Sequence, residues 1–371
     1  MDTRFPRLCR LLHLRAALIL NWALFAAVGF WPFNFRQPNL VAALPGEPGL
    51  RFKGMGIAYS DRFIEPAPGA DFTIELLLEP EAEPRRGIPC ILSIYDGSLP
   101  ENLMLGQWRS GLVVRTAIAS TGGGRRYRES GAERVLRKGE RHLVSMSSGS
   151  NGTTYYLDGR QVARQAAYRP GREALRGRLV LGSSVTGGSP WQGNLLGAAI
   201  IARSLDDAEI EARRRAWYAR DEHALAAAPG LLALYLMESG REGVLRDRSG
   251  NGIDLLLPDR FAVLRRVAFA PPHGQDLRDL AINVLGFVPF GFMLAACLGE
   301  RRRGRRLPDL LIAIVVGALT SAGIETVQIF LPTRSSTIMD VLANTLGTAL
   351  GALPATVFRL PGSQRNQRAQ A

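Results

Sequence analysis

Residues 310–331 read LLIAIVVGALTSAGIETVQIFL, and this stretch decides the class of protein to which the chain belongs. A helix needs about 20 consecutive apolar residues to cross the hydrocarbon core of a bilayer, and Glu325 is the one ionisable residue in this run. Residues 279–298 and 338–358 are runs of similar length and composition. The sequence therefore predicts three transmembrane helices near its C-terminal end.

The N-terminal segment predicts a fourth span. An apolar run, 16–31, follows the arginine-rich residues 1–15 and ends in WPFNF (31–35), an aromatic sequence typical of a membrane–water interface. We interpret residues 16–33 as the first transmembrane helix, retained in the protein. A cleaved signal peptide is the alternative, because VAAL (41–44) offers weak cleavage-site chemistry.

Arginine is distributed unevenly around these runs. The loop ERRRGRR (300–306) and the tail 359–371 are basic, whereas the loop 332–337 carries only Arg334. Short cytoplasmic loops carry an excess of Lys and Arg. The sequence therefore predicts that both ends and the 300–306 loop are cytoplasmic, and that Arg334 and residues 46–265 lie outside. Scarce lysine suggests a GC-rich bacterial genome, so we expect the bacterial cytoplasmic (inner) membrane.

The net charge of +13 over 371 residues raises the alternative of a nucleic-acid-binding protein. Because the densest basic clusters lie beside apolar runs, membrane orientation explains the charge, and we expect no nucleic-acid partner. The cysteines and histidines show neither a disulfide framework nor a metal-ligand spacing, so no metal and no other cofactor is expected. These residues are Cys9, Cys90, Cys297, His13, His142, His223 and His273.

Residues 46–265 contain no run long enough to cross a bilayer and have the pattern of a β domain. In DFTIELLLEP (71–80) apolar residues alternate with polar ones, which is the period of a half-buried strand. Asp158-Gly159 in TTYYLDGRQVARQ predicts a hairpin turn. SLDDAEIEARRRAWYARDE predicts one helix with Ser204 as its N-cap. Short strands at this spacing favour an antiparallel β-sandwich.

Two carboxylates on one strand, Glu75 and Glu79, are the residue type that glycoside hydrolases use in pairs. Alternating charge on an outer face of the sheet explains them better. No catalytic residue is therefore predicted.

The C-terminal region resembles the VanZ-like family. The matching stretches are NVLGFVPFGF (283–292), IETVQIFLPTRSSTIMDVLANTLG (324–347) and WPFNF at the end of the first span. The resemblance implies a small helical membrane protein of a family named for low-level resistance to the glycopeptide teicoplanin. It places residues 279–358 in a VanZ-like domain, interrupted after the first span by the β domain.

The β region resembles LamG-like, concanavalin A-like lectin/glucanase domains. The resemblance rests on DFTIELLLEP (71–80), GERHLVSMSSGSNGTTYYLDGRQV (139–162) and GNLLGAAIIARSLDDAEI (193–210). SGREGVLRDRSGNGIDL (239–255) resembles the element that often opens such domains, so we expect the chain to complete its sandwich in a shifted order. The fold class is thus α+β and multidomain, with about four helical spans and an inserted concanavalin A-like jelly roll.

Polar residues within or beside the apolar runs form the candidate functional site. Residues three or four apart share one face of a helix, and a carboxylate inside a span normally faces protein or water and has a partner. On the predicted topology all of them lie near the outer side of the bilayer, with Arg334 as the expected partner of Glu325. The cluster consists of Asn283, Glu325, Gln328, Arg334, Asp340 and Asn344.

This cluster has two interpretations that the sequence leaves open. It is either a polar lock between helices or a site for a lipid-linked or glycopeptide head group or a proton. The leading hypothesis is a non-enzymatic envelope protein, in contact with the bilayer, whose sandwich binds cell-wall glycan or glycopeptide. Its expected process is glycopeptide resistance or envelope polysaccharide handling. The alternatives are a membrane enzyme or transporter for a lipid-linked precursor, using Glu325 and Asp340, and a scaffold that docks a protein partner.

Overall fold

The computed structural model describes residues 4–119, 125–238, 243–269, 277–301, 306–332, 334 and 336–357. Most of the basic loop and the predicted cytoplasmic tail lie outside these residues. The chain divides into two compact units, which are described separately below. One consists of Met1–Phe35 and Arg266–Ala371, and the other of Arg36–Arg265.

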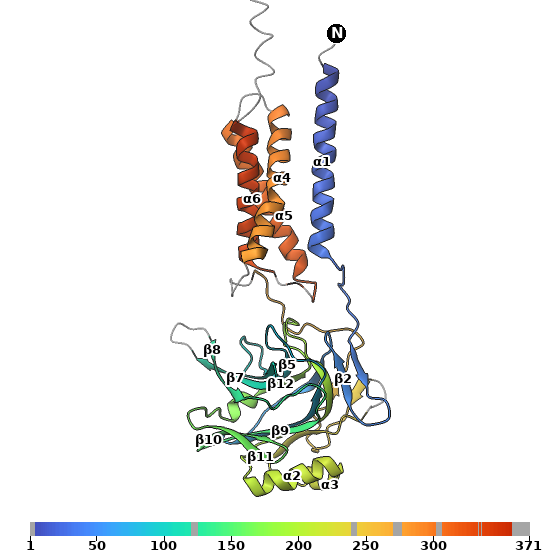
Figure 1. The fold of residues 1–371 in the computed structure, drawn as a ribbon, viewed down its shortest axis with the longest axis vertical. Helices are drawn as coiled ribbons and strands as arrows, with labels where there is room; N and C mark the ends of the chain where they lie inside the picture. The colour runs from blue at the N-terminus through green and yellow to red at the C-terminus, as the bar shows by residue number, and fades with distance from the viewer. Residues whose placement is uncertain are drawn as a thin grey trace, which may run out of the picture. The chain divides into compact units, whose positions relative to one another are not determined.

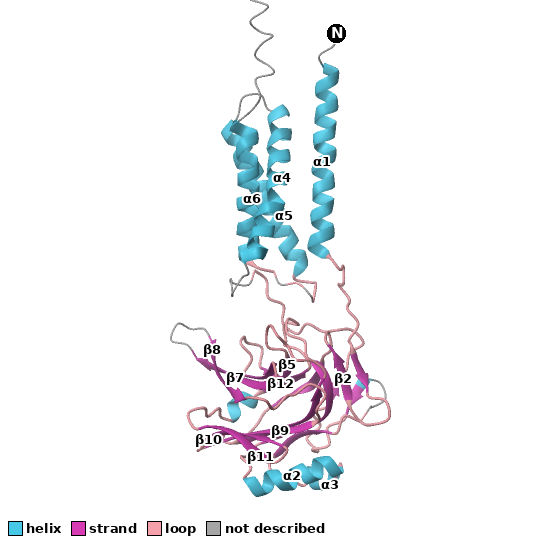
Figure 2. Cartoon of the chain, viewed as in Figure 1, coloured by secondary structure: helices cyan, strands magenta, loops and turns pink. Residues whose placement is uncertain are grey.

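The first unit is helical (Figures 1 and 2). Its helices are α1 (Arg4–Phe30), α4 (Leu277–Arg301), α5 (Arg306–Gln328) and α6 (Ile338–Val357). Among the described residues, these four helices contain stretches long and apolar enough to cross a membrane: Leu12–Phe30, Leu277–Gly299, Leu307–Gln328 and Ile338–Val357.

Helices α4 and α6 are in backbone contact because glycine lies at their crossing. A Cβ atom added at Gly347 would lie 2.1 Å from the carbonyl oxygen of Val284, and one at Gly351 would lie 1.9 Å from that of Val288. No larger residue fits at either position without moving the helices. Small residues four apart allow this close approach between membrane helices.

Two helix ends differ from the predicted bounds. Helix α1 ends at Phe30, so Trp31 and Pro32 lie outside it. Helix α5 ends at Gln328, and Ile329–Leu331 continue as a turn in which Leu331 N–H bonds to the carbonyl of Gln328 at 2.9 Å. Hydropathy marks which residues are apolar, but it does not mark where the hydrogen-bond ladder ends.

The second unit is an antiparallel β-sandwich (Figure 2). The first sheet is ordered β1-β2-β13-β4-β9-β10-β11, with β14 also paired to β13; its strands are β1 (Val41–Ala43), β2 (Leu50–Lys53), β4 (Phe72–Pro80), β9 (His142–Gly149), β10 (Gly152–Leu157), β11 (Arg160–Gln165), β13 (Gln192–Ile201) and β14 (Leu231–Tyr235). The second sheet is ordered β15-β16-β3-β12-β5-β6-β7-β8; its strands are β3 (Ala58–Ile64), β5 (Cys90–Tyr95), β6 (Leu103–Trp108), β7 (Gly111–Ala119), β8 (Arg125–Ala132), β12 (Gly177–Leu181), β15 (Val244–Leu245) and β16 (Leu255–Leu256).

The alternation in β4 separates two buried layers. Ile74 and Leu76 point into the core between the sheets. Leu77 points the other way, into a second apolar layer with Trp217 and Leu225. Those two residues belong to α2 (Asp207–Ala219) and α3 (Glu222–Ala226), which cover the outer face of the first sheet (Figure 1).

The prediction of a half-buried strand is wrong at Glu75, which lies on the outer face of the sheet but is buried there. Its side chain is fully buried beneath α2, where Arg213 Nε donates to both carboxylate oxygens at 2.8 Å and Trp217 Nε1 donates to one at 2.7 Å. A polar residue on alternate positions indicates only that it faces away from the main core. Here that second face is covered by a helix rather than by water.

The predicted N-cap of α2, Ser204, is also wrong. The N-cap is Asp206, whose side chain accepts from the N–H of Glu209, while the Glu209 side chain accepts from the N–H of Asp206. This reciprocal pair needs Glu or Gln three positions after the cap, and the residue three positions after Ser204 is Asp207. Leu205 is buried in a small apolar cluster, and the cap residue Asp206 after it still has an extended backbone.

Two further predictions are confirmed. Asp158 and Gly159 both have positive φ and join β10 to β11, with Leu157 paired to Arg160. Positive φ at both central residues is the requirement of a type I′ hairpin turn. The sandwich is also completed in the expected shifted order. The segment after β14 forms β15 and β16, which add to the edge of the second sheet beside β3.

The chain enters and leaves the sandwich along one antiparallel pair of segments. The N–H of Phe261 bonds to the carbonyl of Gln37 at 2.9 Å, and the N–H of Asn39 bonds to the carbonyl of Asp259 at 3.0 Å. Between them Pro38 and Arg260 form a bridge. The two ends of this unit are therefore held side by side.

Candidate functional site

The predicted polar cluster lies at one end of the helical unit. Asn283 is near the start of α4, Glu325 near the end of α5, and Asp340 near the start of α6. Since α5 is antiparallel to its neighbours in chain order, these positions meet at the same end. The contacts below show which cluster members touch.

Glu325 caps a neighbouring helix. Its side chain is 3% exposed, and its Oε2 accepts from the N–H of Thr337 at 2.9 Å, just before α6 begins. The Thr337 hydroxyl in turn accepts from the N–H of Asp340 at 3.1 Å. A carboxylate at a helix N-terminus satisfies an otherwise unpaired N–H and interacts favourably with the helix dipole.

Asp340 and Asn344 link α6 to two different helices. Asp340 Oδ1 accepts from Asn283 Nδ2 on α4 at 2.7 Å. Asn344 Nδ2 donates to the Ser321 hydroxyl on α5 at 2.9 Å, and both residues are buried. Oδ1 of Asn344 has no hydrogen-bond partner among the described residues.

Gln328 and Arg334 contact α1 instead. Gln328 Nε2 donates to the carbonyl of Gly29 at 2.9 Å. Arg334 donates to the carbonyl of Val28 at 3.1 Å and to that of Trp31 at 3.3 Å. The expected ion pair with Glu325 is not found among the described residues, because the guanidinium satisfies carbonyls that the end of α1 leaves unpaired.

The cluster thus consists of links between helices: Asp340 to α4, Asn344 and Glu325 between α5 and α6, and Gln328 and Arg334 to α1. Each carboxylate accepts a hydrogen bond from a neighbouring helix or its leading turn. This geometry suits a polar lock.

A second candidate site is a cleft in the sandwich that the sequence did not predict. Its volume is about 610 Å³, and it lies between β7, β8 and the segment that joins β11 to β12. Ligand pockets commonly measure about 300–1,000 Å³. Figure 1 shows the β7–β8 hairpin, whose residues line this cleft, at one side of the sandwich.

One wall of the cleft, residues 168–176, is held in place by hydrogen bonds to its backbone. Thr153 donates to the carbonyl of Tyr168 at 2.8 Å, and Ser148 donates to that of Pro170 at 2.9 Å. At the other end Asn102 donates to the carbonyl of Arg176 at 2.7 Å. A wall fixed at several points forms the cleft before any ligand arrives.

The floor of the cleft is polar but uncharged. Thr116 Oγ1 donates to the Tyr168 hydroxyl at 3.0 Å, and both side chains are buried. Burial raises the pKa of Tyr168 to about 12, so the phenol is neutral at physiological pH.

The rim of the cleft carries more positive than negative residues. Exposed arginines at 128, 169 and 176 line it, together with Asp96 and Glu173. Guanidinium groups and neutral hydroxyls together suit a polyhydroxylated ligand that also bears acid groups.

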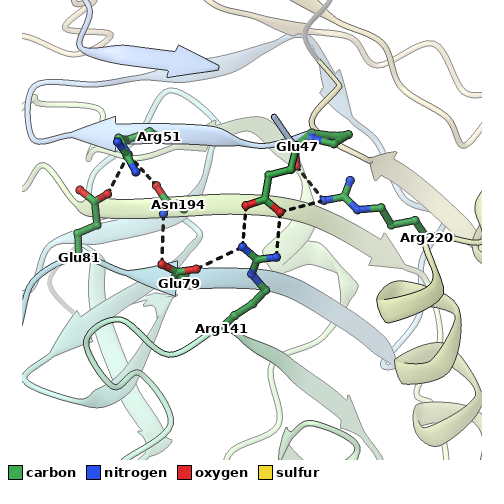
Figure 3. Close-up of polar contacts among 8 residues, drawn as sticks. Glu47, Arg51, Glu79, Glu81, Arg141, Asn194 and Arg220 are labelled. Carbon is green, nitrogen blue, oxygen red and sulfur yellow. Dashed lines mark hydrogen bonds and ion pairs between the residues drawn. The ribbon is translucent and has the colours of Figure 1, made fainter. Parts of the chain in front are cut away.

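A third polar group, on the first sheet, forms a closed set of ion pairs (Figure 3). Arg141 donates to both oxygens of Glu47, at 2.9 and 2.7 Å, and lies 3.4 Å from Glu79. Those hydrogen bonds hold the pKa of Glu47 below its ordinary value. Arg51 also forms an ion pair with Glu81, with its Nε 2.8 Å from the carboxylate. Because these charges pair with one another, the group braces the sheet rather than offering a binding site.

The comparisons with known proteins agree with both resemblances. Residues 231–359 match the VanZ/LLP1 family model, and residues 58–211 match the model of the Concanavalin A-like lectin/glucanases superfamily. The chain thus joins a VanZ-like segment to a concanavalin A-like domain. A search of curated proteins found no match.

Solved structures similar to the chain share low sequence identity with it. A Bacteroides ovatus protein described as carbohydrate-binding is 15% identical with a TM-score of 0.39; the match covers 59% of this chain and 63% of that one. The binding domain of Paraclostridial Mosquitocidal Protein 1 is 11% identical with a TM-score of 0.36, covering 49% and 47%. The sialidase CBM40 of Ruminococcus gnavus, bound to α2,3-sialyllactose, is 13% identical with a TM-score of 0.31, covering 43% and 99%. The chain thus spans less than two thirds of the first two.

Proposed function

We propose that this chain is a multi-pass protein of the bacterial cytoplasmic membrane whose sandwich, on the outer side, binds an envelope glycan in the cleft beside β7 and β8. The cleft is the observation that carries the proposal, because its size, fixed wall and rim of arginines suit an oligosaccharide. The match of residues 58–211 to a superfamily that includes lectins supports it.

The proposed orientation follows from the arginine asymmetry. The loop 300–306 and the tail 359–371 are basic, while the loop 332–337 holds one arginine. Under the positive-inside rule this distribution puts residues 1–15 and 359–371 in the cytoplasm and residues 46–265 outside. The four apolar helices support membrane insertion.

The test of glycan binding is a titration of the full chain, purified in detergent, with peptidoglycan fragments and with neutral and acidic oligosaccharides. Since three arginines outnumber two carboxylates at the rim, we expect acidic oligosaccharides to bind more tightly. Replacing Arg128 or Arg169 with glutamine removes a charged hydrogen-bond donor, so affinity should fall about tenfold.

The matched control is Arg62→Gln, since the Arg62 side chain is 72% exposed and lies outside the cleft. This variant should bind like the wild type. Equal losses in Arg62→Gln and Arg128→Gln would contradict the cleft as the site, and the absence of binding to every glycan would contradict the function.

A link to glycopeptide tolerance is the second candidate function, favoured by the match of residues 231–359 to the VanZ/LLP1 family. Expression of the gene in a teicoplanin-sensitive bacterium should raise the inhibitory concentration of teicoplanin. An unchanged concentration, with the protein present in the membrane, would count against this role.

A further inference from the structure

An apolar groove of about 280 Å³ lies between three helices of the helical unit. Ile19 and Trp22 on α1 form one side, Val316 on α5 forms the other, and Phe290 and Leu294 on α4 also line it. All five residues lie within the stretches that can cross a membrane. With the membrane insertion proposed above, the medium around the groove is hydrocarbon, and the groove can hold an apolar chain.

Beyond one end of the groove, polar contacts join α1 to α5. Gln328 bonds to the carbonyl of Gly29, and a Cβ atom added at Gly29 would lie 3.2 Å from Ile324. Trp22 lies seven residues before Gly29, which is about 10 Å along a helix at about 1.5 Å per residue. Helices α1 and α5 thus meet near Gly29, and the groove lies about 10 Å farther into the spans.

Two exposed arginines lie near the end of the helical unit where α1 meets α5. Arg334 uses Nε and Nη2 on the carbonyls of Trp31 and Val28, while Arg266 donates to the carbonyl of Ile329 at 2.9 Å. A guanidinium has five N–H donors in a fork that matches phosphate oxygens. Each arginine is therefore fixed in position and keeps donors for an anion at the membrane surface.

We propose that this groove binds the hydrocarbon chain of an anionic membrane phospholipid, whose phosphate is held by Arg334 and Arg266. The apolar lining accounts for the chain and the two positive charges account for the phosphate. The distance of about 10 Å along α1 separates a phosphate at the surface from a chain within the hydrocarbon core. This inference rests on the membrane insertion proposed above and is independent of glycan binding.

The experiment uses the full chain in phosphatidylcholine vesicles that contain a minor fraction of a lipid brominated on its acyl chains. Bromine quenches nearby tryptophan, and the Trp22 signal is the difference between the wild type and Trp22→Phe. At equal mole fraction, brominated phosphatidylglycerol should quench Trp22 with about 25-fold higher apparent affinity than brominated phosphatidylcholine, since each of the two arginines contributes about fivefold for an anionic lipid.

The variants separate the charge from the groove. Arg334→Gln should lower the preference for phosphatidylglycerol about fivefold, the share of one arginine, and Arg334→Lys, which keeps the charge, should retain most of the preference. Val316→Phe fills the groove and should reduce quenching by phosphatidylglycerol. Leu319→Phe is its control, because Leu319 lies on the same helix, is 67% exposed and does not line the groove.

Each contrary result has its own meaning. Equal quenching by the two lipids, or an undiminished preference in Arg334→Gln, would overturn the lipid site while leaving membrane insertion intact. A change from dimer to monomer in Val316→Phe with unaltered quenching would overturn it by placing a second copy in the groove. Absence of Trp22 quenching by either lipid would instead refute insertion itself.

Discussion

Removing one partner of the buried ion pair between Glu75 and Arg213 should destabilise the sandwich severely. Arg213 is 6% exposed, and its Nη2 lies 2.7 Å from the Glu75 carboxylate, which also accepts from Trp217. Glu75→Gln keeps the size of the side chain but leaves a buried guanidinium without a counter-charge. Breaking a buried ion pair in this way costs about 3–5 kcal/mol.

The double variant Glu75→Leu/Arg213→Met distinguishes the pair from simple packing. When both charges are removed no uncompensated ion remains, and the replacement of a buried pair by apolar residues is often neutral or stabilising by about 1–4 kcal/mol. The double variant should therefore be more stable than Glu75→Gln. In Glu75→Gln the amide oxygen can still accept from the Trp217 N–H, whereas the double variant leaves that N–H without its acceptor. The comparison therefore understates the effect of the buried charge.

The assay is urea unfolding of the full chain in detergent, followed by the β-sheet signal in circular dichroism. The matched control is Glu129→Gln, because Glu129 pairs with Arg115 at 2.8 Å but its side chain is 48% exposed. Such surface pairs contribute about 0–1 kcal/mol. If Glu75→Gln cost no more than Glu129→Gln, the reasoning from burial would be refuted.

Four further predictions concern both units. Gly351→Ala should push α4 away from α6, cost about 1–3 kcal/mol and lower the abundance of the protein in the membrane. Gly286→Ala is the control and should leave abundance unchanged, because nothing lies within 4 Å of a Cβ at that position. Equal abundance of the two variants would contradict the glycine contact. Glu325→Gln should keep an acceptor for the Thr337 N–H and preserve membrane abundance, while Glu325→Ala should cost about 1–3 kcal/mol. If both variants lower abundance equally, the negative charge itself is required and a neutral polar lock does not explain Glu325. Because Arg141 lowers the pKa of Glu47 from its ordinary 4.5, their pair stabilises above that pH and is lost as pH falls through the lowered pKa. Arg141→Gln should therefore reduce stability at pH 7 by at most about 1 kcal/mol and have a smaller effect at pH 2. A larger effect at pH 2 than at pH 7 would contradict this sign. Alkaline phosphatase fused after Gly193 or Ser336 should be active and fused after Arg303 inactive; activity at all three positions would refute the proposed orientation.

The sequence predicted elements that depend on local pattern. The helices follow from run length, and β4 and the Asp158-Gly159 turn follow from alternation and turn chemistry. What lies above a strand is not local, so the burial of Glu75 was missed. A signal did exist, since Arg213 and Trp217 are four residues apart on α2 and therefore share the face that covers Glu75.

The sequence predicted the residues of the polar cluster but not the cleft in the sandwich. The members of the polar cluster lie in or beside the spans, so their chemistry makes them conspicuous, but the partner of Arg334 depends on where α1 ends. The cleft joins Thr116 to Tyr168, which are separated by 52 residues. Only the folded sandwich brings these two residues together, and no residue spacing in the sequence predicts their contact.

The paired entry and exit segments of the sandwich, with Gln37 bonded to Phe261 and Asn39 to Asp259, make the domain an exchangeable module. Because the two ends of the inserted domain are adjacent, α1 and α4 need not be far apart to accommodate it. A loop of a few residues could therefore replace the domain between these two helices. The same arrangement would let other sandwiches occupy that position. Evolution could then change what the membrane protein recognises without altering the packing of its helices.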